Sequence, residues 1–155
     1  MSHSNPARAA AALRGAVGSV FIVSGLLKLL YENQGPGRFA KIGLPDPTQL
    51  AYFVGLVEIA AGTMLVLGLL TRLAAIPLVI DMVVAIATTK VPLLFGAGPE
   101  PVAAMPKTGF LAFAYQARLD LTMLTACVYF VIVGAGVLSL DEILSRRRTA
   151  ASVPA

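Results

Sequence analysis

Residues 49–70 read QLAYFVGLVEIAAGTMLVLGLL and residues 73–89 read LAAIPLVIDMVVAIATT, and only Thr71 and Arg72 stand between these two apolar runs. A transmembrane helix needs about 20 mostly apolar residues to cross the roughly 30 Å hydrocarbon core of a bilayer. Each run has about that length, so we predict two membrane-spanning helices. Because the connection is so short, they must form a tight antiparallel hairpin.

Two further apolar runs flank the hairpin, at Leu13–Leu30 and Leu119–Leu138. The chain of 155 residues is 57% hydrophobic and 13% charged, with a mean hydropathy of +0.83. Soluble domains rarely have this composition, and a chain this short cannot hide so much apolar surface from water. The sequence therefore predicts an all-α membrane protein, a bundle of four transmembrane helices over residues 13–145. We expect a flexible N-terminus over 1–12 and a basic, flexible tail over 146–155.

Positive charges beside the spans predict the orientation of the bundle. The twelve Lys and Arg residues divide evenly between the two sides, but Arg8, Arg14, Arg72 and the run Arg146–Arg148 lie directly at span ends. We therefore predict that both termini are cytoplasmic. The pI of about 9.6 then reflects membrane topology and gives no case for nucleic-acid binding.

The connection between the third and fourth spans, Val91–Tyr115, mixes large apolar residues with Gly and Pro. Such a segment is not helical throughout, and non-helical backbone is tolerated at membrane depth only where it is buried in protein or wet. We expect a long outer loop here that lies in the interface or dips back into the protein. The connection Tyr31–Thr48 is a second Gly- and Pro-rich loop on the same side.

Lys28 and Glu58 are ionisable residues inside predicted spans, where charge is expensive. At about 1.5 Å per residue, Lys28 lies about 21 Å above Arg14 and Glu58 about 20 Å above the hairpin. Two opposite charges at one depth on neighbouring helices predict an ion pair. This pair either fixes helix register only or takes part in ligand binding. Small residues flank both, namely Ser24, Gly25, Gly55 and Gly62.

Asp81 lies at about 14 Å on the same scale, without a cation at its level. Pro77 is one turn earlier and cannot donate to the carbonyl of Leu73, so a kink or a freed carbonyl is expected beside Asp81. Asp81 is therefore a candidate proton relay. The alternative is a neutral carboxyl group that is hydrogen-bonded to a neighbouring helix.

A third group of charges lies near the outer edge, where Lys90 ends the third span and Arg118 and Asp120 begin the fourth. Polar residues continue from there at intervals of three and four, which places them on one helix face. They are Tyr115, Arg118, Thr122, Thr125 and Tyr129. We expect this stripe to face the bundle interior. Lys28, Glu58, Tyr115, Arg118 and Asp120 would then line a ligand pocket in the outer half of the membrane; a polar-packed bundle without a ligand is the alternative.

Nine segments resemble the bacterial DoxX family in order and spacing, over roughly Leu13 to Arg147. They are GLLKL (Gly25–Leu29), RFAKIGLP (Arg38–Pro45), VGLVEI (Val54–Ile59), GLLTRLAA (Gly68–Ala75), IDM (Ile80–Met82), TKVP (Thr89–Pro92), ARLD (Ala117–Asp120), GAG (Gly134–Gly136) and SLD (Ser139–Asp141). The resemblance implies a multi-pass protein of the bacterial inner membrane, associated with oxidoreductases that handle sulfur compounds, quinones or reactive oxygen. Tyr115 and Gln116 stand where related chains carry His-Glu, which argues against a metal or acid–base role there.

Three functions are compatible with these residues. The first is a membrane subunit that binds a quinone. The sequence has one cysteine (Cys127), one histidine (His3, in the N-terminal segment that we expect to be flexible) and no Gly-rich loop, so it predicts no site for a metal or a covalently bound cofactor. A partner oxidoreductase would therefore have to carry the redox cofactor. The second is a non-enzymatic anchor for a partner enzyme. The third is a small proton-coupled carrier that uses Asp81, which four spans without an inverted repeat support least.

Overall fold

The computed structural model describes residues 6–97, 107–136 and 138–151. Within these ranges the chain forms helices, and four segments are long and apolar enough to span a membrane: Arg8–Leu30, Pro47–Leu67, Thr71–Leu94 and Phe110–Val133. The prediction of a multi-pass, all-α protein with four membrane-spanning helices is therefore confirmed.

The four spans are built from six of the helical elements. The first span is α1 (Pro6–Leu30), the second α3 (Pro47–Leu67) and the fourth α6 (Phe110–Val133). The third is α4 (Thr71–Ala85), continued by a π-helical turn η1 (Ile86–Lys90) and a short α5 (Val91–Leu94). The short helix α2 (Pro36–Ile42) lies between α1 and α3, and α7 (Leu140–Ala151) follows α6.

The hairpin between α3 and α4 is tight, as predicted, but its connection is Gly68–Leu70, and Thr71 and Arg72 form the first turn of α4. Gly68 ends α3 in the left-handed region at φ 67°, and the Leu69 N–H donates to the Met64 carbonyl over 2.9 Å. This is the hydrogen-bond pattern by which glycine commonly ends helices. The second span therefore ends at Leu67 and not at Leu70, where the sequence predicted its end. The next helix, α4, starts at Thr71.

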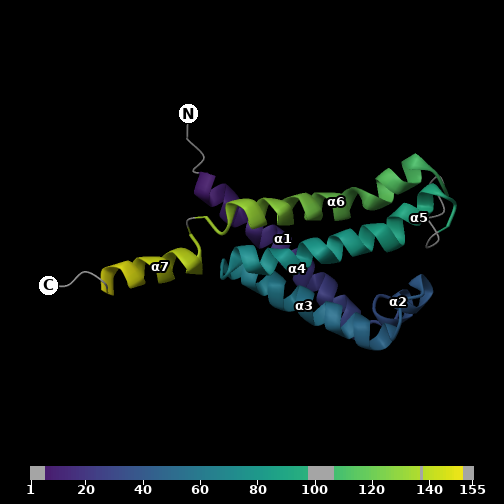
Figure 1. The fold of residues 1–155 in the computed structure, drawn as a ribbon, viewed down its shortest axis with the longest axis horizontal. Coiled ribbons are helices and arrows are strands. Elements are labelled where there is room, and N and C mark those ends of the chain that lie inside the picture. Colours follow the sequence, from purple (N-terminus) through teal and green to yellow (C-terminus); the bar gives the residue numbers. More distant parts are fainter. Residues whose placement is uncertain (1–5, 98–106, 137, 152–155) are drawn as a thin grey trace.

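The helices form two pairs, with α1 packed against α3 and α4 packed against α6. The pairs meet at the end where α1 and α7 begin, and they diverge toward the end that carries α2 and α5 (Figure 1). We call these the termini end and the loop end. The cytoplasmic location of the termini end stays a prediction.

Apolar packing among all four spans lies in the middle of the bundle and toward the termini end. Its buried residues are Val17, Phe21, Ala61, Leu65, Ala74, Ala75, Leu78, Met82, Met123, Ala126, Cys127 and Phe130. The ion-paired residues Lys28, Glu58, Lys90 and Asp120 lie further along their helices, on the side of the loop end. The interior is therefore apolar toward the termini end and charged toward the loop end, where the two pairs diverge (Figure 1).

Glycines bring α1 and α3 into close contact at two levels. A Cβ atom on Gly18 would lie 2.6 Å from the Gly62 carbonyl oxygen, and one on Gly25 would lie 2.5 Å from the Gly55 carbonyl oxygen. Distances this short exclude any side chain on Gly18 or Gly25 at the present helix separation. Small residues drive helix association in membranes in this way, because they let backbones approach.

The fourth span differs from its prediction at both ends. It begins at Phe110, well before Leu119, and ends at Val133, before Leu138. Gly109 and Gly134 flank it with φ of 90° and 86°, and the aromatic residues assigned to a loop form its first turns. The expected loop Val91–Tyr115 therefore shortens to residues 95–109, of which 98–106 lie outside the described part of the chain.

Both ends of the chain are more helical than expected. α1 already includes residues 6–12, because Pro6 is suited to a first helical turn and Ala9–Ala12 have high helix propensity. α7 continues through the expected flexible tail to Ala151. Ser139 caps α7 by accepting a hydrogen bond from the Glu142 N–H over 3.2 Å, a Ser-x-x-Glu capping pattern. Residues 1–5 and 152–155 lie outside the described ranges.

Candidate functional site

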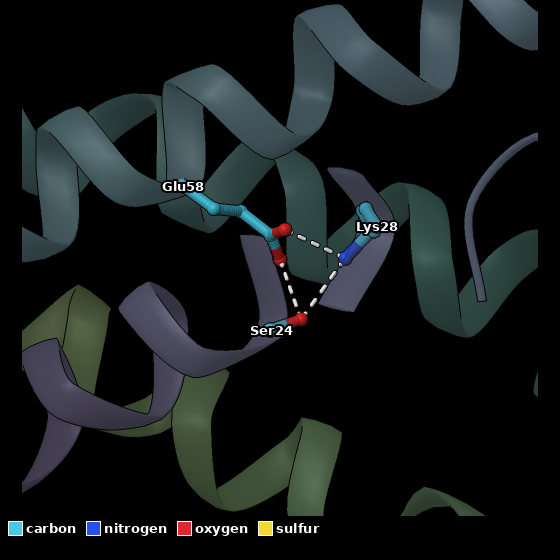
Figure 2. Close-up of polar contacts among 3 residues, drawn as sticks. All are labelled: Ser24, Lys28 and Glu58. Atoms are coloured by element: carbon cyan, nitrogen blue, oxygen red, sulfur yellow. Dashed lines mark hydrogen bonds and ion pairs between the residues drawn. The ribbon is translucent and has the colours of Figure 1, made fainter. Parts of the chain in front are cut away.

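Lys28, Ser24 and Glu58 form a closed cluster of polar contacts between α1 and α3 (Figure 2). The Lys28 Nζ donates to Glu58 Oε2 over 2.6 Å and to Ser24 Oγ over 2.9 Å. Ser24 Oγ in turn donates to Glu58 Oε1 over 3.0 Å. Glu58 is fully buried, while the Lys28 side chain is 15% exposed. The structure thus joins the two residues that depth alone places side by side.

The glycine contacts explain why this ion pair is so short. Gly25 follows Ser24 directly, and a Cβ atom on Gly55 would lie 3.3 Å from the Lys28 Cβ. The two backbones approach closely at the level of the charges, so Lys28 reaches Glu58 across the helix interface. A buried pair of this kind is stable only when geometry and extra hydrogen bonds offset its desolvation, and Ser24 supplies such bonds.

Asp81 on α4 is not alone, contrary to the expectation from sequence. Its carboxyl group interacts electrostatically with Glu58, Lys28 and Asp120. Asp81 Oδ2 is buried and has no hydrogen-bond partner among the described residues. The depth estimate missed this neighbourhood because the two helix pairs face each other at this level. Asp81 therefore lies within electrostatic range of charged residues on both helix pairs.

Lys90 and Asp120 form a second ion pair at 3.5 Å, between η1 and α6, with side chains 12% and 22% exposed. Arg118 was expected in this cluster but lies elsewhere. Its guanidinium stacks 3.6 Å over the Tyr115 ring and donates to the Tyr115 carbonyl oxygen. Tyr115 and Arg118 are both exposed. The structure therefore does not confirm the expected cluster of Arg118 with Lys90 and Asp120, and a ligand pocket that combines Tyr115, Arg118, Lys28, Glu58 and Asp120 stays a prediction.

The polar stripe of α6 faces away from the bundle. Each of its five residues is exposed: Tyr115, Arg118, Thr122, Thr125 and Tyr129. The prediction that the stripe lines the interior is wrong because the opposite face carries the small and apolar residues that pack, including Ala117, Cys127 and Phe130. Periodicity identifies a face of a helix, but packing decides which way that face points.

A pocket of about 320 Å³ opens beside the Lys28 cluster at the loop end. It is lined by Lys28, Leu29, Leu30, Tyr31, Glu32, Pro36, Thr48 and Tyr52. Sequence analysis missed all of these except Lys28, because they come from the ends of α1 and α3 and from the loop between them. A signal was present in Tyr31, which follows the first span, and in Tyr52, which lies near the start of the second, because aromatic residues commonly lie at a membrane interface.

A second polar cluster, which sequence analysis also missed, closes the termini end. Arg14 is 3% exposed, and its Nη1 and Nη2 donate to the carbonyl oxygens of Ala135 and Leu138 over 2.5 and 2.8 Å. Asp141 accepts hydrogen bonds from the N–H groups of Leu70 and Thr71 over 2.8 and 3.3 Å. Arg14 was used only to predict orientation, yet it ties α1 to the segment that joins α6 and α7.

We expect Asp141→Asn to lower the free energy of unfolding by about 1–2 kcal/mol, because the carboxylate caps the first turn of α4 and its loss removes a charged acceptor. Hydrogen exchange at Leu70 and Thr71 should become faster in the variant. Asp46→Asn is the matched control, since Asp46 precedes α3 without a side-chain capping bond. Equal effects of both substitutions would contradict a capping role for Asp141.

Metal ligation finds no support in the described ranges. They contain no group of three or more His, Cys, Asp or Glu side chains placed to hold a metal ion. Cys127 is a free, buried cysteine in the apolar core. The candidate site therefore consists of the Lys28–Ser24–Glu58 cluster, the neighbouring Asp81 and the loop-end pocket.

Comparison with known proteins agrees with this architecture. A family model described as DoxX matches residues 9–91. "Uncharacterized membrane protein Rv3486" of Mycobacterium tuberculosis is 46% identical over 139 residues, which are 89% of this chain and 82% of the relative. "Putative oxidoreductase CatD" of Bacillus subtilis is 25% identical over 143 residues, 92% of each chain. No solved structure matches. This multi-pass membrane protein belongs to the DoxX family.

Proposed function

We propose that this DoxX-family protein is the membrane subunit of an oxidoreductase system in the bacterial inner membrane, and that it binds the ring of a quinone or a similar lipid-soluble redox carrier in the loop-end pocket. The observation that carries the proposal is the position of Lys28. Its side chain lines the pocket and also belongs to the buried cluster with Ser24 and Glu58. The Lys28 ammonium group thus lies between the loop-end pocket and the buried carboxyl group of Glu58.

Lys28 has a donor to offer to such a ligand. A lysine ammonium carries three N–H donors, and two of them bind Ser24 Oγ and Glu58 Oε2. The third is available to a ring carbonyl oxygen in the pocket. A hydrogen bond from a charged donor becomes stronger as negative charge develops on the ring oxygen during reduction. Lys28 would therefore stabilise the reduced form of the carrier relative to the oxidised form.

The remaining walls of the pocket suit a planar ring. Tyr31 and Tyr52 are 55% and 43% exposed and both line it, so their rings are accessible for stacking. The volume of about 320 Å³ lies at the lower end of the range for small-molecule sites. It accommodates a ring, while an attached isoprenoid tail would extend into the lipid.

Protons and electrons would take separate routes. Reduction of a quinone to a quinol takes two electrons and two protons. A partner oxidoreductase would supply the electrons, which is consistent with the word oxidoreductase in the name of the relative CatD. Glu58 and Asp81, which interact electrostatically, would carry the protons between the pocket and the centre of the bundle.

The test is binding of decylubiquinone and menadione to the full chain in lipid nanodiscs. The protein has no tryptophan and four tyrosines, so in a Tyr115→Phe/Tyr129→Phe background the quenching of tyrosine fluorescence reports on ligands near Tyr31 and Tyr52. We expect saturable binding that Lys28→Met weakens by about 10-fold or more, the loss expected for one charged hydrogen bond. Quinone should also be present in lipid extracts of protein purified from native membranes.

Lys90→Met is the matched control, because Lys90 is the other partly buried lysine in an ion pair but does not line the pocket. The affinity of the Lys90→Met variant for both quinones should equal that of the wild-type protein. Tyr52→Ala provides an independent change in the pocket for the case that Lys28→Met unfolds. A native lipid extract without quinone, together with no saturable binding, would sink the proposal.

A further inference from the structure

The five exposed polar residues of α6, which we call the α6 stripe, extend along most of the membrane. They are Tyr115, Arg118, Thr122, Thr125 and Tyr129. At 1.5 Å per residue the stripe is about 21 Å long. Exposed side chains on the neighbouring spans are mainly large and apolar, for example Phe53 and Leu56 on α3 and Ile80 and Val83 on α4. The stripe therefore stands out from the surface that these helices present to lipid.

Arg118 lies well inside the membrane. The Arg72 Nη2 donates to the Ile132 carbonyl oxygen over 3.2 Å, which places Ile132 level with the start of α4 at the termini end. Arg118 is about 21 Å further along α6. With Ile132 taken as the edge of a hydrocarbon core of roughly 30 Å, about 9 Å remains beyond the Arg118 backbone, and the guanidinium lies one turn nearer the loop end, at Tyr115. A charge at such a depth is costly unless it has a partner.

The described part of the chain gives Arg118 no counter-charge. Its guanidinium contacts only its own helix, at the ring and the carbonyl oxygen of Tyr115. The nearby carboxylate of Asp120 pairs with Lys90 instead. Thr122 and Thr125 donate to the carbonyls of Arg118 and Leu121 over 2.8 Å, so their hydroxyl oxygens are left as acceptors. The stripe thus presents one charged donor and two acceptors on an exposed face.

We propose that the α6 stripe is the docking face for a transmembrane helix of another membrane protein, and that this helix carries a carboxylate at the depth of Arg118. Charge complementarity selects this occupant. A buried arginine–carboxylate pair satisfies the guanidinium, and a helix running along α6 also covers Thr122, Thr125 and Tyr129. The inference does not depend on quinone binding.

The two other possible occupants fit less well. In a dimer with a twofold axis parallel to the helices, Arg118 would face its own copy across α6, and like charges would repel. A phospholipid phosphate could reach Arg118 if the side chain extended toward the surface, but the same phosphate could not also reach Thr125 or Tyr129, which lie about 10.5 Å and about 16.5 Å further along α6. A partner helix satisfies the whole length of the stripe.

Photo-crosslinking in cells of the native host tests the proposal. A photoreactive p-benzoylphenylalanine is placed at Thr122 in the full chain, and at Leu56 on the lipid-facing side of α3 as the control. We expect a discrete protein adduct from position 122 and none from position 56. Mass spectrometry should locate the adduct in a transmembrane helix that contains Asp or Glu. Arg118→Leu should lower the yield by about 10-fold or more, and Arg118→Lys should retain part of it.

A charge exchange gives the decisive result. Arg118→Asp should abolish the adduct, and replacement of the partner's carboxylate by arginine should restore it. The proposal is overturned if position 122 crosslinks only to phospholipid or only to a second copy of this chain. It is also overturned if the adduct is insensitive to Arg118→Leu, or if the crosslinked helix carries no acidic residue. Circular dichroism of each variant separates loss of docking from loss of fold.

Discussion

Gly25→Ala is expected to destabilise the bundle by more than about 2 kcal/mol, although alanine is normally the better helix former. The new Cβ atom would lie 2.5 Å from the Gly55 carbonyl oxygen and 2.8 Å from Ile59 Cγ1. A backbone oxygen cannot move aside as a flexible side chain can, so α1 and α3 must separate. Overpacking of this kind costs about 1–3 kcal/mol or more, and separation would also lengthen the Lys28–Glu58 contact.

Gly15→Ala is the matched control on the same helix. A Cβ atom there meets nothing within 4 Å, so this substitution should be neutral or should stabilise α1 by up to about 1 kcal/mol through helix propensity. Unfolding in mixed micelles, followed by circular dichroism as the fraction of denaturing detergent rises, measures both variants. Similar midpoints for Gly25→Ala and Gly15→Ala would rule out the close packing of α1 and α3.

Lys28→Met is expected to cost about 3–5 kcal/mol, because it leaves the carboxyl group of Glu58 buried without its cation. Glu58 is fully buried, and its two oxygens bind Lys28 and Ser24. Removal of both partners in Lys28→Met/Glu58→Met replaces the pair by apolar side chains and should restore much of the stability. The two single changes should therefore be strongly non-additive in a double-mutant cycle.

The same double variant separates the two roles left open for this pair. If Lys28 and Glu58 only fix helix register, the refolded double variant should still bind quinone. If Lys28 holds the ring oxygen, the double variant should be stable and yet fail to bind. Lys90→Met should cost less than Lys28→Met, because its partner Asp120 is 22% exposed whereas Glu58 is 1% exposed, and the Lys90–Asp120 contact is longer at 3.5 Å. Additive losses from Lys28→Met and Glu58→Met would show that the 2.6 Å contact contributes little.

Height along a helix could be derived from the sequence, and this is why the Lys28–Glu58 contact could be predicted. Arg14 sets the origin for the first span and the hairpin sets it for the second and third, and a fixed rise per residue then gives the depth of each charge. The short hairpin and the four spans follow from the same apolar runs. The length of a span and the depth of a charge along it depend only on the sequence of that one helix.

Rotation about the helix axis could not be derived in this way. The stripe around Arg118 has the same periodicity whether it faces the bundle or its surroundings, and only the packing of residues such as Ala117 and Phe130 decides between them. The burial of Arg14 was missed for a related reason. Its acceptors, the carbonyls of Ala135 and Leu138, lie in an irregular segment whose path depends on the assembled helices.

The link from Arg14 to Ala135 and Leu138 also constrains the order of biogenesis. The sequence separations are 121 and 124 residues, so the acceptors for the guanidinium emerge from the ribosome long after α1 has met the membrane. Until they arrive, Arg14 must stay hydrated at the bilayer surface. The first helix therefore reaches its final depth and contacts only after the fourth span has been made, and the connection between α6 and α7 completes the packing at the termini end.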